Sequence, residues 1–538
     1  MDLTMVIGML VRSIVICNLM FTSSWLANTC PSMCNCFNGV QVFCSNNKIT
    51  QIPADIPANV TDLMFLETFI TSLKGESFAS CNSLMKILLV SNNIHDIDED
   101  TFQGLPHLTD LEISANPLDV IKPRTFNNLK ELQKLIITHN SIRNIPCNLF
   151  ENTTKLQLLA LQGNNISEIC PGLFSQLKNL RELNLASNEI SKLPIDSFKH
   201  LRNLSILKLN DNNITQILPG SFDKLSNLTE LSLDGNHLTR IFRYTFESLT
   251  SLKKLSVVKN SIKELNPRIF STLNNLKWLA IESNQITTLP AGIFDGLQNL
   301  ANLLLGGNQL QTIPKGIFLN LENLETLVLS YNQIRSLEYD AFEGLQSLTH
   351  LYLDNNQLEA LHENIFKNTS NLLVISLHHN LLRVLPEGIY GHLPNLVSIV
   401  LHNNQWWCDC SFSHFLNWMK ENRDVTQISE IMCEGPEHLR GKSITLLKNR
   451  DLKCPESQNP SFMVKEIAIR NGTEENIIQS VCKSYLTSNG SLIIHCEVTV
   501  CSSINVNICR MDETSTTSFT KEGSQCEPTN LKFTITST

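Results

Sequence analysis

The chain lacks the residue patterns on which most protein catalysis depends. None of its 14 histidines begins an H-x-x-E pair, and the motif H-E-x-x-H is absent, so zinc hydrolase chemistry lacks its ligands. The sequence also has no G-x-S-x-G nucleophile turn and no phosphate-binding loop. We therefore expect a protein that is not an enzyme, with no catalytic residues, no metal ligands and no cofactor.

An excess of positive charge and an uninterrupted apolar run are missing as well. The chain has 42 Lys and Arg residues but 51 Asp and Glu residues, which gives a net charge of −9. This negative charge argues against binding to nucleic acid or, through a polybasic segment, to a membrane. The long apolar stretch from Met5 to Phe21 is broken by Arg12. We interpret residues 1–27 as a signal peptide, with a retained membrane anchor as the alternative. The mature protein is expected to be secreted, with no membrane or nucleic-acid partner.

What the chain does have is an asparagine every 24 residues. Each one belongs to the phrase L-x-x-L/I-x-L/I/V-x-x-N-x-L/I/W, as in the stretch from Leu180 to Ile190. These ladder asparagines are Asn92, Asn116, Asn140, Asn164, Asn188, Asn212, Asn236, Asn260, Asn284, Asn308, Asn332, Asn356, Asn380 and Asn404. A ladder of phenylalanines with the same period runs from Phe78 to Phe366 and ends on Tyr390. A period of 24 in this phrase is typical of a leucine-rich-repeat solenoid.

The phrase predicts how each repeat folds. The L-x-L alternation indicates a short strand that pairs with the same strand of the next repeat. The asparagine amide has a donor and an acceptor for backbone groups left open where the chain turns away from the strand. The phenylalanines fill the convex side. We expect an α/β solenoid, curved, with parallel strands on the concave face, disulfide caps at both ends and a small C-terminal β domain. Its wall of about 65–70 Å suits a protein domain better than a small molecule.

Cysteine clusters mark the two ends of the repeat array. They are Cys30, Cys34, Cys36 and Cys44 at one end and Cys408, Cys410, Cys433 and Cys454 at the other. Both clusters resemble the caps of extracellular leucine-rich-repeat proteins. That resemblance implies the pairs Cys30–Cys36, Cys34–Cys44, Cys408–Cys433 and Cys410–Cys454. A cap helix is expected from Phe412 to Trp418, with Ser411 as its N-cap.

Other cysteines lie inside the array and in the tail. Cys81 takes a slot that Leu105 fills in the next repeat, which predicts a buried small hydrophobe. Cys147 and Cys170 lie at nearly the same phase of adjacent repeats, so a disulfide between them is expected. The tail has five cysteines and strand-like alternation, which indicates a small stapled β domain. The expected organisation is a signal peptide (1–27), an N-terminal cap (28–59), fifteen repeats (60–407), a C-terminal cap (408–455) and the β domain (456–538).

Nine Asn-x-Ser/Thr sequons are expected to carry glycans in a secreted chain. They are Asn59, Asn152, Asn165, Asn203, Asn213, Asn227, Asn368, Asn471 and Asn489. No sequon lies between Asn227 and Asn368. A surface without glycans suits a protein partner, so this stretch of the wall is a candidate binding surface.

Ring side chains gather at the outward positions of the later repeats. The candidates for partner binding are Trp278, Tyr331, His350, Tyr352, His378 and His402. Two alternatives are scattered surface rings without a shared role, and a partner site on the C-terminal β domain. His378 and His402 are one period apart and are expected to stack. A metal site at this place is disfavoured, because the sequence places no carboxylate or further ligand beside them.

Several stretches narrow the resemblance within the repeat family. They are Cys34-Asn-Cys36-Phe37, Val42-Phe43-Cys44-Ser45, Asp55-Ile56-Pro57, Phe65-Leu-Glu-Thr68, Phe415-Leu-Asn-Trp418 and the tail cysteines Cys482, Cys496, Cys501 and Cys526. Together they resemble the family of large, non-catalytic subunits of carboxypeptidase N. Gln405, in place of a usual proline, and Cys509 depart from the pattern.

The resemblance implies a plasma glycoprotein in a hetero-oligomer. Such a subunit binds, stabilises and carries a catalytic zinc carboxypeptidase that removes C-terminal Lys or Arg from kinins and anaphylatoxins. The alternative is a soluble extracellular leucine-rich-repeat receptor or adhesion-type protein that binds another ligand.

Overall fold

The computed structural model describes residues 30–422 and 431–453, together with the strands of the C-terminal segment (467–471, 474–478, 482–486, 492–500, 504–510, 513–521 and 527–535). The expected signal peptide, 1–27, lies outside these residues. The chain divides into two compact units, Met1–Asp451 and Leu452–Thr538.

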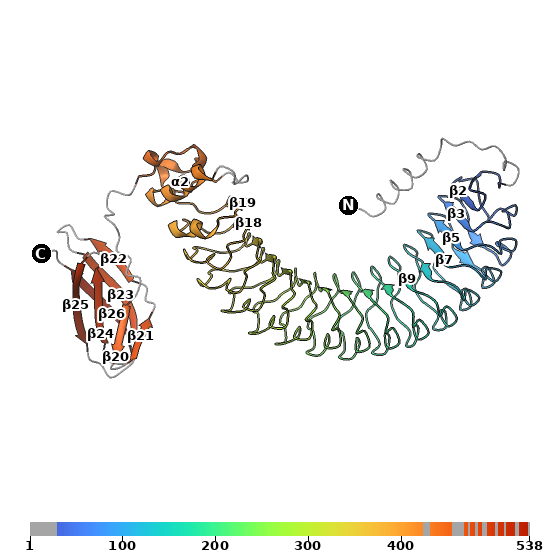
Figure 1. Ribbon diagram of the computed structural model, residues 1–538, viewed down its shortest axis with the longest axis horizontal. Helices are drawn as coiled ribbons and strands as arrows, with labels where there is room; N and C mark the ends of the chain where they lie inside the picture. The colour runs from blue at the N-terminus through green and yellow to red at the C-terminus, as the bar shows by residue number, and fades with distance from the viewer. Residues whose placement is uncertain are drawn as a thin grey trace. The chain divides into compact units, whose positions relative to one another are not determined.

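The first unit is a curved solenoid with its strands along the concave side (Figure 1). A 17-stranded sheet runs through it. Its strands are β1 (Cys34–Phe37), β2 (Gln41–Cys44), β3 (Asp62–Leu66), β5 (Lys86–Val90), β7 (Asp110–Ser114), β8 (Lys134–Ile136), β9 (Leu158–Ala160), β10 (Glu182–Asn184), β11 (Ile206–Lys208), β12 (Glu230–Ser232), β13 (Lys254–Ser256), β14 (Trp278–Ala280), β15 (Asn302–Leu304), β16 (Thr326–Val328), β17 (His350–Tyr352), β18 (Val374–Ser376) and β19 (Ser398–Val400). The short strands β4 (Ser72–Leu73) and β6 (Asp96–Ile97) form a separate pair.

The pairing follows the sequence period. From β2 onward each strand is parallel to the next, and within the array residues 24 apart lie opposite each other, as Leu183 and Leu207 do. Successive residues of a strand point to opposite faces, so only every second side chain faces the interior of the solenoid. The leucines of the phrase occupy these inward positions. The prediction of a parallel-strand solenoid is confirmed.

The ladder asparagines tie neighbouring repeats together through their backbones. Nδ2 of Asn188 donates to the carbonyl oxygens of Leu161 (3.0 Å), Leu185 (3.1 Å) and Ala186 (3.1 Å). Its Oδ1 accepts from the backbone N–H of Ile166, at 3.1 Å. Each side chain is buried, and it satisfies polar groups that would otherwise be buried unpaired. The predicted role of the ladder is confirmed.

The residue before each ladder asparagine has a left-handed backbone. From Ser91 to Asn403 all fourteen of these residues have φ between 52° and 71°. This conformation lets the chain leave the strand within one residue, but it costs most residues about 1–2 kcal/mol. Glycine takes it without this penalty, yet only Gly163, Gly235 and Gly307 stand there. The sequence analysis did not predict this turn.

The phenylalanine ladder forms a stack inside the convex side. Phe78 and Phe102 have ring centroids 5.9 Å apart, and Phe174 and Phe198 are 6.4 Å apart. The ladder continues into the C-terminal cap, because Tyr390 stacks on Trp418 with ring centroids 4.9 Å apart. Burial raises the pKa of Tyr390.

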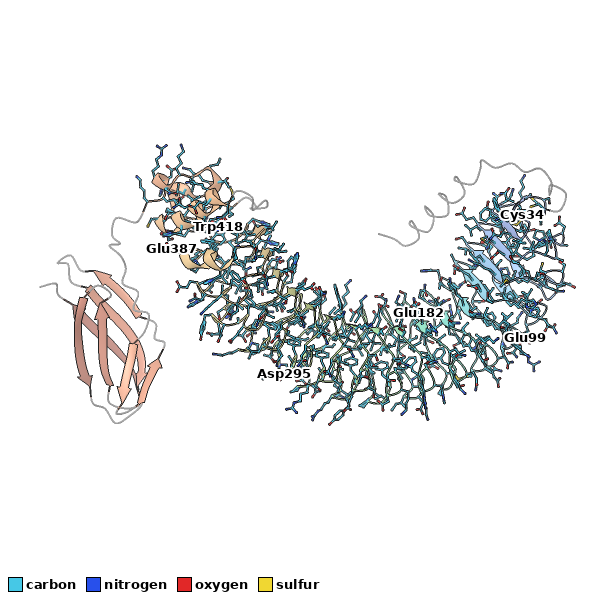
Figure 2. The ribbon with its side chains drawn as sticks, in the orientation of Figure 1. Cys34, Glu99, Glu182, Asp295, Glu387 and Trp418 are labelled. Atoms are coloured by element: carbon cyan, nitrogen blue, oxygen red, sulfur yellow. A yellow bond between two sulfur atoms is a disulfide. The ribbon has the colours of Figure 1, made fainter. Side chains whose placement is uncertain are left out.

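Short helices build the C-terminal cap. They are η1 (Glu387–His392), η2 (Cys410–Phe412), α2 (Ser413–Glu421), η3 (Glu437–Leu439), η4 (Ile444–Leu446) and η5 (Asn449–Asp451). Figure 2 marks Trp418 of α2 and Glu387 of η1 close together, and Nδ1 of His414 lies 3.0 Å from Oε1 of Glu387. The expected N-cap at Ser411 is wrong. Oδ1 of Asp409 accepts from the Ser411 N–H at 2.9 Å and starts η2, from which α2 continues.

Disulfides lie in both caps and in the array. They join Cys30 to Cys36, Cys34 to Cys44, Cys147 to Cys170 and Cys408 to Cys433. Cys410 is disulfide-bonded too, and Cys454 lies outside the described residues. Cys81 is free and buried, which confirms its predicted place in the core.

The second unit contains antiparallel sheets. A four-stranded sheet has the order β21-β20-β24-β25, and a three-stranded sheet has the order β22-β23-β26. The strands are β20 (Ile467–Asn471), β21 (Glu474–Ile478), β22 (Cys482–Leu486), β23 (Leu492–Val500), β24 (Ile504–Arg510), β25 (Glu513–Lys521) and β26 (Glu527–Ile535). The register of β22 and β23 sets the Cα of Cys482 opposite that of Cys496. Cys501 and Cys526 lie outside the described residues.

Candidate partner-binding surface

The predicted binding residues lie along one stretch of the concave face, here called the ring wall (Trp278 to His402). Trp278 begins β14 and His350 begins β17, and the strand register puts them in the same row, three strands apart. Neighbouring strands are about 4.8 Å apart, so roughly 14 Å separates these two residues. Trp278 is 36% exposed, which is high for so large a ring. His350 stacks near Tyr352, at 6.4 Å between ring centroids.

Tyr331 is placed differently from the strand residues. It lies in the turn after β16, with φ of 56°, and its 64% exposure leaves the ring in solvent. Its backbone conformation, and not strand alternation, directs the side chain outward. The six predicted residues thus occupy different positions in their repeats. Trp278 and His350 begin strands, Tyr352 ends one, Tyr331 lies in a turn, and His378 and His402 are each two residues before a ladder asparagine.

Three histidines meet at the C-terminal end of the ring wall. His378 and His402 have ring centroids 4.6 Å apart and are stacked, as expected. His379 packs edge-on against both, at 5.2 Å and 5.6 Å. Burial, followed by the influence of His378 and His379, lowers the pKa of His402. His379 was not among the predicted site residues, although its adjacency to His378 in the sequence was an available signal.

A buried carboxylate lies beside these histidines. Oδ2 of Asp354 is 3.9 Å from Nε2 of His378, and Oδ1 of Asp354 accepts from Oγ of Ser330 at 2.7 Å. Nδ1 of His378 is 2.8 Å from Oγ of Ser376. This Ser–His–Asp grouping is not a nucleophile and its base, because Ser376 is only 4% exposed and a substrate could not reach its hydroxyl.

The part of the concave face that precedes the ring wall is more polar, and its Lys and Glu side chains form ion pairs with one another. Nζ of Lys254 lies 3.3 Å from Oε1 of Glu230, across neighbouring strands. Exposed pairs of this kind contribute little stability and keep the surface hydrated.

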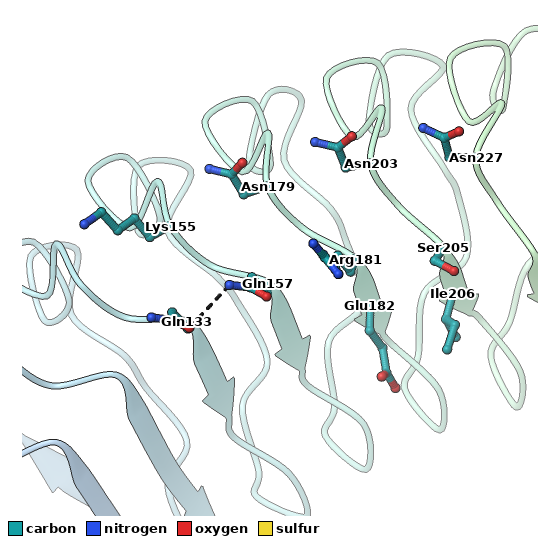
Figure 3. Close-up of a pocket in the computed structure, with 10 residues that line it drawn as sticks. All are labelled: Gln133, Lys155, Gln157, Asn179, Arg181, Glu182, Asn203, Ser205, Ile206 and Asn227. Atoms are coloured by element: carbon teal, nitrogen blue, oxygen red, sulfur yellow. Dashed lines mark hydrogen bonds between the residues drawn. The ribbon is translucent and has the colours of Figure 1, made fainter.

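A polar hollow of about 690 Å³ lies among β8 to β12 (Figure 3). It is lined by Gln133, Lys155, Gln157, Asn179, Arg181, Glu182, Asn203, Ser205, Ile206 and Asn227. Nε2 of Gln157 donates to Oε1 of Gln133 at 3.3 Å. Small-molecule sites are mostly apolar, whereas this lining is almost entirely amide and charged groups. The hollow is separate from the ring wall.

The lining reveals a second set of asparagines that sequence reasoning missed. Asn179, Asn203 and Asn227 stand at the same place in successive repeats (Figure 3). Each donates Nδ2 to a backbone oxygen 25 residues earlier, as Asn203 does to Lys178 at 3.0 Å. Their spacing of 24 was the available signal. Asn203 and Asn227 are also sequons, so any glycans on them would border the hollow.

The structure exposes most of the sequons that it describes. Asn59, Asn152, Asn203, Asn213, Asn227 and Asn368 are exposed, and Asn165 is half-buried. Nδ2 of Asn165 donates to Oε1 of Glu189 at 2.8 Å. Asn471 lies in β20, and Asn489 is outside the described residues.

The match to a family model decides the classification. The model described as "Leucine rich repeat" matches nine overlapping stretches, which together span residues 58–238 and 250–405. The chain belongs to the leucine-rich-repeat family. Within the part of this leucine-rich-repeat protein that the structure describes, no helix has the length and apolarity needed to cross a membrane.

Individual relatives of this leucine-rich-repeat protein match over shorter stretches. Carboxypeptidase N subunit 2 of Mus musculus is 43% identical over 54 residues, which are 10% of this chain and 10% of that protein. Leucine-rich repeat-containing protein 3B of Bos taurus is 35% identical over 111 residues, 20% of this chain and 42% of that protein. The chain thus matches less than half the length of either curated relative.

Among solved structures, plant peptide hormone receptor RGFR1 in complex with RGF2 is similar, with a TM-score of 0.55 and 26% identity. The match covers 67% of this chain and 58% of that chain. Disulfides in both caps indicate an oxidising, extracellular compartment. The chain is an extracellular leucine-rich-repeat protein with an open wall suited to ligand binding.

Proposed function

We propose that this protein is a secreted, glycosylated, non-catalytic subunit that stabilises and carries a catalytic zinc carboxypeptidase in plasma. The enzyme partner would act on the C-terminal Lys or Arg of kinins and anaphylatoxins. Two kinds of support agree: the stretches of the caps, first repeat and tail that resemble such subunits, and the similarity to carboxypeptidase N subunit 2.

We assign the docking surface to the ring wall because exposed aromatic side chains lie there. Trp278 and Tyr331 are exposed on or beside the concave sheet, where an aromatic ring can fill a pocket of a partner. The sequence has no sequon between Asn227 and Asn368, so no N-glycan is attached to this stretch of the chain. Aromatic anchors lose little conformational entropy on binding, which makes them effective contact residues.

The test removes the anchors without disturbing the repeats. Residues at the same position in other repeats are natural replacements: Thr326 for Trp278, Asn355 for Tyr331 and Ser376 for Tyr352. The variant Trp278→Thr/Tyr331→Asn/Tyr352→Ser should secrete and melt like the unmodified protein. Its affinity for the isolated catalytic carboxypeptidase, measured by surface plasmon resonance, should fall about 30-fold, since a central anchor contributes about 2 kcal/mol or more.

Two controls separate the possible outcomes. The exposed Tyr244, which precedes the ring wall in the chain, is changed to serine and should leave binding unaltered. Deletion of residues 456–538 tests the C-terminal unit as a competing site. If that deletion abolishes binding while the triple variant binds normally, the ring-wall assignment is wrong.

The alternative function is an extracellular receptor or adhesion-type protein for another ligand. The complex of a similar plant receptor with RGF2 supports it. Affinity capture from plasma with the full chain discriminates the two. Recovery of a carboxypeptidase supports the subunit, whereas failure of a purified carboxypeptidase to bind the unmodified chain removes that proposal. The chain alone should show no chelator-sensitive hydrolysis of a C-terminal-Arg peptide.

A further inference from the structure

We propose that His378, His379 and His402 form a binding site for a divalent transition-metal ion of the zinc class. The site goes beyond the proposed carrier function and does not depend on it. One potential ligand atom from each of the three residues lies within 4.8 Å of the other two. No other group of three His, Cys, Asp or Glu residues with this property occurs in the described ranges.

The repeat geometry explains why these side chains converge. His378 and His402 are each two residues before a ladder asparagine, so adjacent strands hold them side by side. His379 follows directly and has φ of 53°, and this left-handed backbone lets its ring meet theirs edge-on. Zinc binds imidazole nitrogens at about 2.0–2.1 Å, which sets tetrahedral nitrogens about 3.4 Å apart. Rotation of the exposed His379 side chain and small shifts of the half-buried rings can close that gap.

Surrounding polar groups orient the proposed ligands. Ser376 Oγ contacts Nδ1 of His378 at 2.8 Å, which leaves Nε2 on the side of the Asp354 carboxylate, 3.9 Å away. Metal-binding histidines usually have a polar partner on the second ring nitrogen, which fixes the ring and its tautomer. Nε2 of His379 accepts from Nδ2 of Asn403 at 2.8 Å, so the His379 ring has to turn away from Asn403 before this nitrogen can bind an ion. The sequence argument against a metal was the lack of a carboxylate or further ligand. The structure supplies Asp354 and His379.

The donor set selects the class of ion. Imidazole nitrogens suit zinc, copper and nickel, whereas calcium and magnesium require oxygen ligands. Three protein ligands leave a fourth position of a tetrahedral ion open to water or to a group from a bound molecule. The proposed ion would thus sit on the surface of the ring wall, where a partner could reach it.

The test uses the full secreted chain without a histidine tag. Zn²⁺ binding is measured by equilibrium dialysis and by the shift in melting temperature. His379→Asn removes one ligand, and asparagine already occupies the same left-handed position at residues 355 and 403. His402→Ser removes a second ligand, with the residue found at the equivalent position 330. The matched control is His139→Asn, which removes an exposed histidine from the same left-handed position in a distant repeat.

We expect one Zn²⁺ per chain, and at least tenfold weaker binding in His379→Asn and in His402→Ser. Binding by His139→Asn should be unchanged. Zn²⁺ should raise the melting temperature of the unmodified chain more than that of either ligand variant, and Ca²⁺ should have no effect. All variants should melt alike without metal, so a folding defect would be visible. The proposal is overturned if the unmodified chain binds no Zn²⁺ at micromolar free ion, if both ligand variants bind as tightly, or if His139→Asn loses as much affinity. No carboxypeptidase is used, so the result is independent of the proposed function.

Discussion

Replacing ladder residue Asn260 with leucine should destabilise the array by a predictable amount. Asn260 is 8% exposed. Its Nδ2 donates to the carbonyl oxygens of Leu233 (3.0 Å), Val257 (3.2 Å) and Val258 (3.2 Å), and its Oδ1 accepts from the Leu238 N–H at 3.0 Å. Leucine keeps the branching at Cγ and removes every hydrogen-bonding atom of the side chain.

The magnitude depends on which backbone groups lose their last partner. The Leu233 oxygen also accepts from Asn236, the Val257 oxygen from Asn284 and the Val258 oxygen from the Gly235 N–H. The Leu238 N–H has no second acceptor among the hydrogen bonds of the described residues. One buried donor is thus left unpaired, which costs about 1–3 kcal/mol. The three carbonyl bonds are shared, so their loss should add less than this.

The assay compares Asn260→Leu with Asn274→Leu in the next repeat. Asn274 is exposed, and its substitution should change the free energy of unfolding by about 0.5 kcal/mol or less. Long repeat arrays need not unfold in one step, so urea denaturation is combined with hydrogen exchange. Peptides spanning residues 233–262 should exchange faster in Asn260→Leu. Equal denaturation midpoints and equal exchange in the two variants would refute the assigned role of the ladder.

Two further predictions concern backbone conformation and pH. Lys259→Val should destabilise the chain by about 1 kcal/mol, because φ at this residue is 53° and a β-branched side chain tolerates that region poorly. Lys253 does not have a positive φ, so Lys253→Val is the control in the same denaturation assay. Lys122→Met should lower the free energy of unfolding at pH 7 by less than about 1 kcal/mol, since the Lys122–Asp96 pair (2.8 Å) is 37% and 40% exposed and screened by water. The hydrogen bond from Lys122 lowers the pKa of Asp96 below 3.8. The stability that this pair contributes is therefore present above pH 3.8 and disappears as the carboxylate is protonated at lower pH. If the stability difference between Lys122→Met and the unmodified protein persists in full at pH 2, this assignment is contradicted.

The period of the sequence was enough to predict the sheet and its core. A strict spacing of 24 residues puts every leucine of the phrase opposite its equivalent, as in the pairing of Leu183 with Leu207. It also stacks the phenylalanine rings and buries the asparagines, because each repeat can cover its apolar face only with the next one. Even the exceptions follow this rule. Cys81 and Thr153 are buried in a slot that leucine fills in other repeats.

Features that depend on local conformation were not predicted. The left-handed residue before each ladder asparagine has no common residue type, since lysine, tyrosine, histidine and glycine all occur there. The tertiary fold imposes the conformation, and residue preference does not reveal it. Asp409 was missed as a cap because the chain enters α2 through a turn of 3₁₀ helix. The contact between His379 and His402 was not predicted, because the 24-residue period does not give the side-chain direction of a residue with a left-handed backbone.

The variable positions on the concave face therefore carry what distinguishes this chain from other members of its family. Each repeat offers the same backbone at the two residues before its asparagine and at the ends of its strand. An exchange between equivalent positions, such as His379→Asn after the pattern of Asn355 and Asn403, should leave the fold intact. Loss of binding in such a variant then reports on recognition and not on folding. No such exchange between repeats is possible at a ladder position, because every repeat from Asn92 to Asn404 has asparagine there. The contrast between exchangeable and fixed positions separates the surface that recognises a ligand from the scaffold that holds it.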